Sequence, residues 1–418
     1  MQLKTILNKC HPIKPFVYGE IRLVETKEGL GLEVEVKSRR NGSPTCSKCG
    51  KPGGVYDRLG ERRFVFVPMW RISVVLLYVM RRVNCEHCKR VVVEKVPWAE
   101  GKRRNCRVYE WFLGDWARSL SWKEVSIRFG TTWDTVRRAV EATVEWGMKH
   151  RDLKGITAIG VDEVSWAKGH RYLTLVYQIN EGCKRLLWIG WDRKEETFRK
   201  FFDWLGEERT AGLEFIVSDM WKPYLKVIGE KAGHVLHILD RFHIMQHFGK
   251  AIDEVRAEEA KRMKQDGYEP ILKRTRWLLL KRPENLTEKQ EARLSDLLRY
   301  NLKSVRAYLL KEDFQGFWTY VSHYWAGRFL DRWCTRALQS RIEPIKKVAR
   351  MLRSHRPLIL NWFKARSQLS AGVVEGFNAK VKLTTRKSYG FRGEKCLQAA
   401  LFLALGNLPK PEDTHRFC

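Results

Sequence analysis

Four cysteines form two closely spaced pairs in the first part of the chain. Cys46 and Cys49 are one Cys-x-x-Cys unit, and Cys85 and Cys88 are another. Two such units can supply four thiolates to one tetrahedral zinc ion. A redox function would favour a single pair beside a β-α-β unit, whereas the residues between these pairs are rich in strand-forming types. We therefore predict a structural zinc site, with His87 as an alternative ligand.

Two aspartates follow apolar stretches that are typical of buried strands. Asp162 follows residues 159–161, and Asp219 follows residues 215–218. A buried carboxylate is costly unless it is paired, so two strand ends that each present an aspartate could share a divalent cation. Oxygen ligands suit magnesium or manganese. From the residues alone, a turn or a helix cap explains each aspartate equally well.

A third acid could complete this set. Glu375 lies in a predicted helix over residues 370–382, where Glu375, Asn378 and Lys382 share one face. A third carboxylate would let a second ion bind, and paired ions activate water and stabilise the leaving oxygen in phosphodiester chemistry. The helical pattern by itself is equally typical of an exposed helix with a polar pair.

The acids need a framework, which the apolar pattern predicts. Five strands are expected at residues 156–162, 171–179, 185–191, 213–218 and 234–239, with a helix at 195–205. This order is typical of an α/β core with a mixed sheet, in which Asp162 and Asp219 lie at strand ends. From residue 241 to 362 the periodicity is almost entirely helical.

Short helices precede this core. A capping box begins at Ser121, Gly130 ends the helix that follows, and Thr132 caps the next one. A short helix, a glycine turn and a longer helix are typical of a helix-turn-helix. Its second helix would present three side chains to DNA: Thr135, Arg137 and Arg138. Packing without DNA contact is the alternative.

The charge of the chain indicates a polyanionic partner. Lys and Arg number 79 against 48 Asp and Glu, which gives a formal net charge of +31 and a pI near 9.9. So large an excess attracts nucleic acid and speeds the encounter with it. The alternative, a highly soluble surface, is less favoured because the same excess makes the folded chain repel itself. The longest apolar run, near residues 73–80, is too short to cross a bilayer, and the first 15 residues do not read as a signal peptide, so we expect a cytoplasmic protein.

Motifs spread along the chain resemble those of the DDE transposases of the ISL-three (ISL3) insertion-sequence family, a bacterial group. The matching stretches are residues 159–163 (Ile-Gly-Val-Asp-Glu), 168–172 (Lys-Gly-His-Arg-Tyr), 217–221 (Val-Ser-Asp-Met-Trp) with Tyr224, 240–243 (Asp-Arg-Phe-His), 374–380 (Val-Glu-Gly-Phe-Asn-Ala-Lys) and 388–392 (Ser-Tyr-Gly-Phe-Arg). The four cysteines and the helix-turn-helix resemble the amino-terminal head of that family. The resemblance therefore extends over nearly the whole chain.

The resemblance implies an α/β fold with a ribonuclease-H-like catalytic core and a long all-helical insertion, preceded by a zinc-ribbon and a helix-turn-helix. It assigns Asp162, Asp219 and Glu375 as the catalytic triad that binds Mg²⁺ or Mn²⁺. The implied domains are 1–100 for the zinc-binding β-rich head, 101–150 for the helix-turn-helix, 151–245 for the first part of the core, 246–365 for the helical insertion and 366–418 for the last part of the core.

The implied function is that of a transposase that binds terminal inverted repeats and performs metal-dependent strand cleavage and strand transfer of an insertion sequence. Its partners would be the double-stranded DNA of transposon ends and target, and further copies of the chain in a dimer or larger assembly, associated with the bacterial nucleoid. Basic side chains near the predicted active site would anchor DNA phosphates: Lys380, Lys382, Arg386, Lys387 and Arg392. Two alternatives stay open, a transposase-derived DNA-binding regulator without catalysis and a structure-selective nuclease of the same fold.

Overall fold

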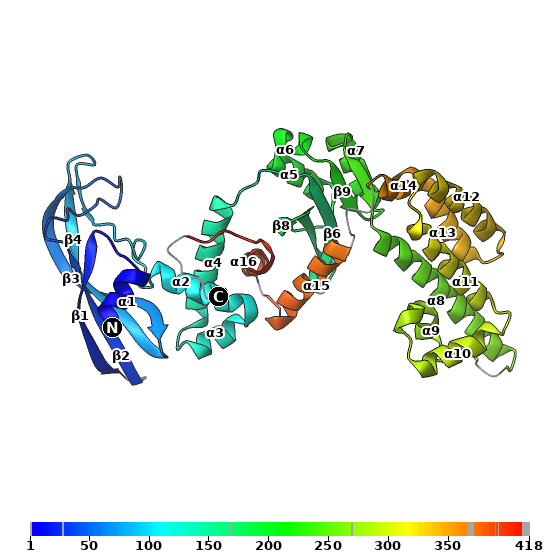
Figure 1. Ribbon diagram of the computed structural model, residues 1–418, viewed down its shortest axis with the longest axis horizontal. Helices are drawn as coiled ribbons and strands as arrows, with labels where there is room; N and C mark the ends of the chain where they lie inside the picture. Colours follow the sequence, from blue (N-terminus) through cyan, green and yellow to red (C-terminus); the bar gives the residue numbers. More distant parts are fainter. Residues whose placement is uncertain are drawn as a thin grey trace. The chain divides into compact units, whose positions relative to one another are not determined.

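The chain folds into two compact units. A computed structural model describes residues 2–26, 29–167, 169–268, 271–365, 372–388, 390–391 and 393–411 (Figure 1). The first unit comprises Met1–Asp152 together with Thr384–Cys418, and the second comprises Leu153–Leu383. The resemblance grouped residues 366–418 with the catalytic core, whereas this division assigns the part from Thr384 onward to the first unit. Within the described ranges, no helix is both long and apolar enough to span a membrane.

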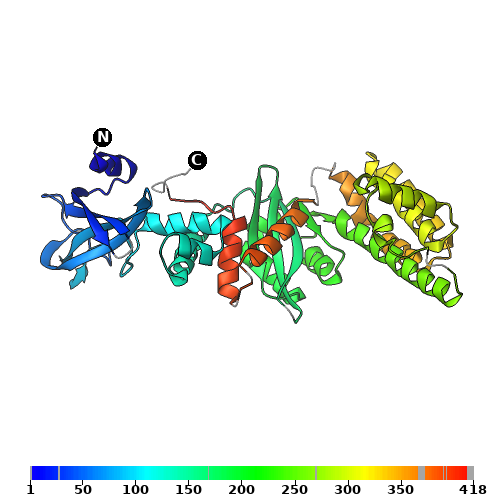
Figure 2. The ribbon, with the colours of Figure 1, turned by 90° about the horizontal axis from the view of Figure 1, so that it is seen from below.

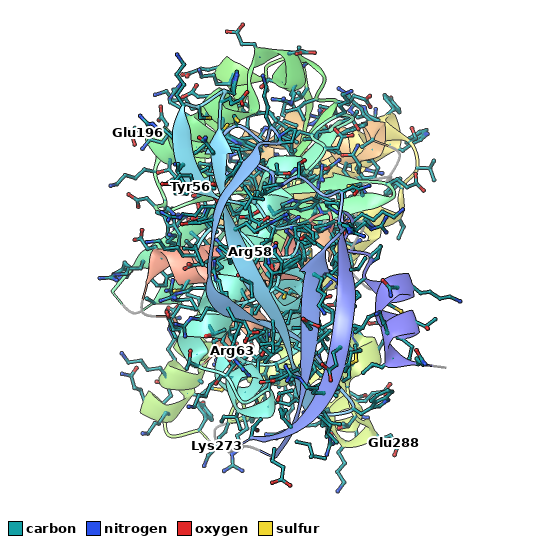
Figure 3. All side chains as sticks on the ribbon, turned by 90° about the vertical axis from the view of Figure 1, so that its left-hand side faces the viewer. Tyr56, Arg58, Arg63, Glu196, Lys273 and Glu288 are labelled. Atoms are coloured by element: carbon teal, nitrogen blue, oxygen red, sulfur yellow. The ribbon has the colours of Figure 1, made fainter. Side chains whose placement is uncertain are left out.

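A five-stranded sheet dominates the beginning of the first unit (Figure 2). Helix α1 (Leu3–Cys10) precedes its strands, which are β1 (Phe16–Thr26), β2 (Gly29–Ser38), β3 (Gly54–Met69), β4 (Ile72–Cys85) and β5 (Arg90–Val93). The order is β1-β2-β4-β3, and β5 pairs with the end of β4. Phe16 and Phe64 pack edge to face on Trp98 in the core. Tyr56 and Arg58 of β3 are exposed (Figure 3).

Three helices follow in the first unit, and the second and third begin where the sequence predicts. They are α2 (Arg107–Ser119), α3 (Trp122–Arg128) and α4 (Trp133–His150). Ser121 and Glu124 form the capping box that starts α3. The hydroxyl of Thr132 accepts the N–H of Thr135 (3.1 Å) and so caps α4. A later helix, α16 (Glu394–Leu405), packs against α4.

The second unit is built on the mixed sheet that the apolar pattern predicts. Its strands are β6 (Ala158–Ala167), β7 (Arg171–Asn180), β8 (Cys183–Gly190), β9 (Phe215–Ser218) and β10 (Leu236–Leu239). The order is β10-β9-β6-β7-β8. The first three strands in sequence pair antiparallel, and β9 and β10 add in parallel beside β6.

The two faces of β6 meet different helices. Ile159 and Val161 point into an apolar core formed with α5 (Glu195–Leu205) and α7 (Lys222–Lys231); the short α6 (Glu207–Ala211) follows α5. Because side chains alternate along a strand, residues 160 and 162 belong to the opposite face. That face meets α15, described in the next subsection.

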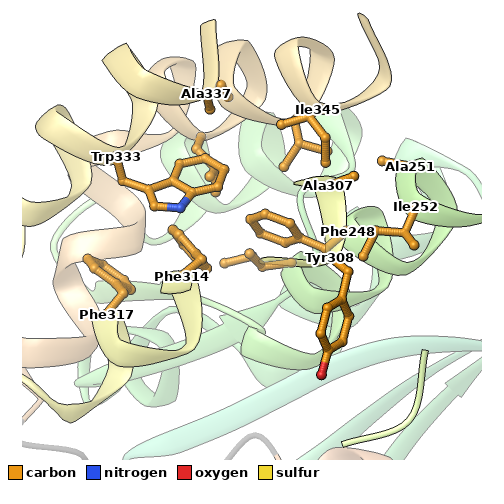
Figure 4. Packing of buried hydrophobic residues seen from close by; sticks show 14 of the residues in the cluster. Phe248, Ala251, Ile252, Ala307, Tyr308, Phe314, Phe317, Trp333, Ala337 and Ile345 are labelled. Atoms are coloured by element: carbon orange, nitrogen blue, oxygen red, sulfur yellow. The ribbon is translucent and has the colours of Figure 1, made fainter. Parts of the chain in front are cut away.

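The rest of the second unit is helical, as the periodicity predicts. Its helices are α8 (Arg241–Gln265), α9 (Arg276–Leu280), α10 (Glu288–Leu298), α11 (Lys303–Gln315), α12 (His323–Gln339), α13 (Glu343–Ser354) and α14 (Arg356–Lys364), with short 3-10 turns at Pro283–Asn285 and Gly316–Thr319. Figure 4 shows their core, where Phe248 of α8, Phe314 of α11 and Trp333 of α12 have ring centroids 4.8, 4.9 and 5.3 Å apart. This packing anchors α8, whose first turn reaches the candidate site.

Candidate active site and metal centre

A glycine on β6 lets α15 (Gly372–Lys387) approach the sheet closely. A Cβ added to Gly160 would lie only 2.5 Å from Cγ2 of Val374, so any side chain at this position would push the helix away. The apolar pattern predicts Asp162 at the end of its strand, but β6 continues to Ala167, so Asp162 lies within the strand. It is two residues beyond Gly160 and therefore faces α15 as well. The local sequence thus brings an acidic side chain and the helix that carries Glu375 to the same face of the sheet.

Asp162 is oriented by a buried asparagine of α15. Asn378 Nδ2 donates a hydrogen bond to Asp162 Oδ2 (2.5 Å), and Asn378 Oδ1 accepts one from the hydroxyl of Tyr177 on β7 (3.0 Å). Phe377 stacks on the ring of Tyr177, with centroids 4.7 Å apart. These contacts tie β6, β7 and α15 together. Protein contacts alone therefore fix the direction of the Asp162 carboxylate.

Two further aspartates follow the parallel strands. Asp219 comes directly after β9, and its Oδ1 accepts the backbone N–H of Trp221 (2.9 Å). Asp240 comes directly after β10 and caps α8 by accepting the N–H of Phe242 (2.7 Å). Ser218 and Leu239 are partners in the register of the two strands. Asp219 and Asp240 therefore leave the sheet side by side at its carboxyl edge.

His243 links two of these acids. It lies in the first turn of α8, with Nε2 3.5 Å from Asp162 Oδ2 and 3.9 Å from Asp240 Oδ2. An imidazole between two carboxylates can donate a hydrogen bond to either, and in its protonated form it offsets part of their charge. Asp162, Asp240 and His243 therefore form one cluster.

The carboxylates of this cluster repel one another. Burial raises the pKa of Asp162, and the charge of Asp219 raises it further. Burial likewise raises the pKa of Asp240 to about 6, with additional increases from the charges of Asp162 and Glu375. Glu375 is exposed and lies in the first turn of α15. The charge of Asp219 therefore acts on Asp162, and the charge of Glu375 acts on the carboxyl group of Asp240.

The donor chemistry of this region fits a divalent cation. Hard cations prefer carboxylate oxygens, and buried like charges require compensation. The acids are not a closed ligand shell, because the cysteines are the only described group of three or more candidate ligands whose donor atoms all lie within 4.8 Å of one another. Residues 366–371, which lead into α15, lie outside the described residues.

Glu163 belongs to the other face of β6 despite its adjacency to Asp162. Its Oε2 lies 2.6 Å from Nε of Arg193. Burial raises the pKa of Glu163 to about 7. The alternation of side chains along the strand separates it from the face that carries Asp162 and Asn378.

The three polar residues predicted to share one face of α15 differ in their burial. The helical pattern placed Glu375, Asn378 and Lys382 on one face, but only Asn378 is buried, at 8% exposure, while the other two are exposed. The local sequence does not indicate that Asn378 turns toward β6, because its partners Asp162 and Tyr177 lie more than 200 residues earlier in the chain. The acid after the strand at 234–239, Asp240, does have a local signal.

The four predicted cysteine ligands meet in the first unit. Cys49 and Cys85 have Sγ atoms 3.6 Å apart, Cys46 and Cys88 have theirs 4.0 Å apart, and all four lie within 4.8 Å of one another. Thiolates about 2.3 Å from a tetrahedral zinc would be separated by roughly 3.8 Å. The cluster therefore has dimensions compatible with a zinc ion held by four cysteines.

The surroundings of the cysteines also suit a metal knuckle. The backbone N–H groups of Lys48 and Cys88 point to the sulfurs of Cys46 and Cys85, each at 3.4 Å. His87, the alternative ligand, has its Nδ1 3.3 Å from the ammonium of Lys51 and is not part of the cysteine cluster.

The three residues of the helix-turn-helix that are predicted to contact DNA differ in their exposure and in their bonds within the protein. Thr135 takes part in the cap of α4. Arg137 is held by Asp134 (2.7 Å) and Glu141 (2.8 Å) on its own helix. Arg138 pairs with Asp134 at 2.6 Å, but 72% of its side chain is exposed. Arg138 is therefore the most accessible of the three.

The basic residues predicted to anchor DNA near the end of the chain also differ in exposure. Lys380, Lys382 and Arg386 are exposed. Lys387 is half-buried and donates to two carbonyl oxygens near the end of α2 (3.2 and 2.7 Å), so it serves as a helix cap. Arg392 lies outside the described residues.

Comparisons with known proteins agree with one another. Residues 159–401, more than half of the chain, match the family model of the ISL3-type DDE transposases, described as "Transposase". The transposase for insertion sequence element IS1001 of Bordetella parapertussis is 29% identical over 352 residues, covering 84% of this chain and 86% of that protein. The transposase for insertion sequence element IS1557 of Mycobacterium tuberculosis is 29% identical over 429 aligned positions, covering 96% of this chain and 95% of that protein.

Proposed function

The chain belongs to the ISL3 family of DDE transposases, and from this premise we propose that it cleaves DNA at the ends of an insertion sequence and transfers the freed strands to target DNA. Family membership makes it a transposase and thus a nucleic-acid-processing enzyme. The observation that supports the specific chemistry is the cluster of Asp162, Asp240 and His243, on which the charges of Asp219 and Glu375 act.

The catalytic core that we propose is ribonuclease-H-like. Numbered along the chain, its five strands lie in the order 3-2-1-4-5, the first three antiparallel and the last two parallel. Along the chain, the helices α8 to α14 lie between the last strand of this sheet and α15, which supports their assignment as an insertion within the core. The sheet and α15 would then form the catalytic core around the insertion.

Asp162, Asp219 and Glu375 are the ligands that we assign to magnesium or manganese. Such ions, when bound, polarise the phosphate and stabilise both the attacking and the leaving oxygen. The chain itself orients these acids: Asn378 holds Asp162, and the N–H of Trp221 holds Asp219. Pre-set donors of this kind lower the cost of reorganisation during reaction.

Asp240 and His243 complete the surroundings of the triad. His243 Nε2, 3.5 Å from Asp162 Oδ2 and 3.9 Å from Asp240 Oδ2, can donate a hydrogen bond to either carboxylate. Asp240 also caps α8 and thereby fixes the direction from which His243 enters the site. We assign both as positioning residues.

The first unit would recognise the ends of the element. The cysteine cluster is compatible with a structural zinc that stabilises the five-stranded sheet, and α4 would present Arg138 to DNA. The net charge of +31 supports binding to a polyanion. Because two transposon ends must be held together, we propose a dimer or larger assembly on DNA.

Single alanine substitutions of Asp162, Asp219 and Glu375 test the triad. We expect strand cleavage and strand transfer to fall by about a thousandfold or more, because each substitution removes a charge that positions the reacting groups. Binding to duplexes with the terminal inverted repeat should persist. The exposed Asp296 of α10 is a matched control, and Asp296→Ala should retain full activity. Cleavage that survives all three changes would overturn the assignment.

The products that the wild-type protein forms from DNA distinguish the proposed function from the two alternatives. Binding to the inverted repeats without any cleavage in the presence of Mg²⁺ or Mn²⁺ would indicate a DNA-binding regulator. Nicking without strand transfer, or cleavage that depends on branched structure and not on the end sequence, would indicate a structure-selective nuclease. A gel assay that separates nicked, cleaved and joined products gives all three readouts.

A further inference from the structure

A groove of about 810 Å³ runs along α8 in the second unit, between this helix and residues of α9 and α11. One of its lining residues, Phe242, lies in the same first turn of α8 as His243. Phe242, Gln246 and Gly249 line it and form one stripe of α8. His243, which contacts Asp162, is the immediate neighbour of Phe242. A strand that leaves the acidic cluster along α8 would enter this groove.

Two aromatic rings are exposed in the groove. Phe242 is 40% exposed and Trp277 of α9 is 59% exposed, and both line the groove. The guanidinium of Arg276 covers one face of Trp277 at 5.3 Å and is itself held by Asp253 at 3.1 Å. Large rings are normally buried for their apolar surface. Here two of them face a groove, where they can stack on flat ligands.

Two arginines lie near each other at the groove and at the start of α8. Arg282 lines the groove, and Arg241 is the first residue of α8, with its guanidinium 5.1 Å from the centre of the Trp318 ring. Burial lowers the pKa of Arg241, and the nearby charge of Arg282 lowers it further. No carboxylate in the described part of the chain forms an ion pair with either guanidinium. Two unneutralised cations that repel each other are typical of an anion site.

The acids that line the groove are already neutralised. Asp253 pairs with Arg256 and Arg276, at 2.7 and 3.1 Å. Glu254 lies 3.9 Å from Lys347. The charge that remains available in the groove is therefore positive.

We propose that this groove holds one strand of DNA beside the catalytic acids, with a phosphate on Arg241 and Arg282 and an unpaired base against Phe242 and Trp277. Aromatic rings bind bases whose faces are free, whereas the bases of a duplex are stacked on each other. The ligand is therefore a short unpaired segment next to the cleavage position. This inference rests on the proposed function, since it takes DNA as the substrate.

Binding measurements without divalent ions test the groove independently of cleavage. The probes are a duplex with the terminal inverted repeat and the same duplex with a few unpaired nucleotides at its end, each followed by fluorescence anisotropy with the full-length protein. We expect Phe242→Ala and Trp277→Ala to weaken binding of the unpaired probe by about tenfold each. Binding of the paired probe should change less than about twofold.

The arginines give a different expected signature. Arg241→Gln and Arg282→Gln should weaken binding of both probes, and each should reduce the slope of log affinity against log salt by about one unit. Trp277→Phe keeps a stacking ring and should restore most of the preference for unpaired DNA. The controls Trp325→Ala and Arg299→Gln change exposed residues of the same unit outside the groove and should bind like the wild type.

Three outcomes would overturn the proposal. The first is equal binding of both probes by the wild type, and the second is a Trp277→Ala variant that keeps the preference for unpaired ends. The third is a change in self-association without a change in DNA affinity, which would make the groove a surface for a second copy of the chain. Failure of the triad variants to lose cleavage would refute the proposed function and leave these binding results unaffected.

Discussion

The two candidate metal sites of this protein are organised in opposite ways. In the first unit, four cysteine sulfurs lie within 4.8 Å of one another. In the second unit, the described carboxylates influence one another's pKa values without forming so close a group. The cysteines come from two turns of one sheet, whereas the acids come from β6, the ends of β9 and β10, and α15.

The difference follows from the charge of the ligands. A thiol is neutral when protonated, so four cysteines can pack at the spacing of a zinc site before the ion arrives. Carboxylates are charged near neutral pH, and buried like charges repel each other unless a cation lies between them. We therefore expect zinc to stabilise the fold of the first unit, and a divalent cation to draw together acids that the fold only places near each other.

The largest effect should come from removing a zinc ligand. Cys46→Ser or Cys85→Ser would open a site whose binding energy is also folding energy, amounting to about 10 kcal/mol in small zinc domains. The five-stranded sheet should then lose its cooperative unfolding transition, and one zinc per chain should disappear from metal analysis. Circular dichroism and atomic emission give the two readouts.

Cys183→Ser is the matched control for this change. Cys183 is a free cysteine in the second unit, at the start of β8, and lies outside the cysteine cluster. It should change neither the zinc content nor the unfolding of the first unit. A Cys46→Ser protein that retains both its zinc and its sheet would refute the structural role of the metal.

A smaller effect is expected from the asparagine that organises the acidic site. Asn378→Ala leaves the buried hydroxyl of Tyr177 without its acceptor and Asp162 Oδ2 without its amide donor, while Asp162 Oδ1 still accepts the N–H of Glu163. An unsatisfied buried polar group costs about 2 kcal/mol, which should appear as a lower denaturation midpoint of the second unit only. Strand cleavage should also fall, because the Asp162 carboxylate is then oriented less strongly.

A double-mutant cycle separates this role from simple packing. Tyr177→Phe removes the hydroxyl and keeps the ring that stacks on Phe377. If Asn378 and Tyr177 act as a pair, the double variant should be less destabilised than the sum of the single variants by about 1 kcal/mol. Additive effects would show that the hydrogen bond between them contributes nothing to the site.

The same contrast explains how much could be predicted from the sequence. The cysteine cluster can be predicted because Cys-x-x-Cys spacing is local, and the core strands can be predicted because their apolar stretches end at turn residues. The helix starts at Ser121 and Thr132 followed from capping chemistry. By contrast, the sequence predicts a β-rich head without separate strands at β1 and β2, although the alternation of apolar residues with Glu33 and Glu35 is typical of a half-buried strand.

The organisation of the acidic site could be predicted only in part. Asp219 and Asp240 directly follow strands, and Asp162 follows the apolar residues 159–161 inside β6, so each has a local signal. The bond from Asn378 to Asp162 joins residues that are 216 positions apart, and helical periodicity cannot indicate which face of α15 turns toward the sheet. Gly160 is the one local hint, because a glycine inside a strand indicates a close approach of other atoms.

The smallest effect is expected from a variant that tests the charge repulsion between Asp219 and Asp162. Asp219→Asn keeps the oxygen that accepts the N–H of Trp221 but removes one charge from the cluster. Without added divalent ions this variant should be as stable as the wild type or more stable by about 0.5 kcal/mol, because a buried neighbour, Asp162, is relieved of repulsion.

With Mn²⁺ present, the wild type should become more stable than the Asp219→Asn variant. The wild type gains stability because a ligand that binds only the folded state stabilises it, whereas Asp219→Asn has lost one ligand and should gain less. Melting curves with and without Mn²⁺, in a buffer free of chelators that would remove zinc, measure both gains, and Asp296→Asn is the exposed control. Equal gains in the variant and the wild type would mean that Asp219 does not bind the cation, and the contrast between a preformed thiol site and a cation-assembled acidic site would then fail at this residue.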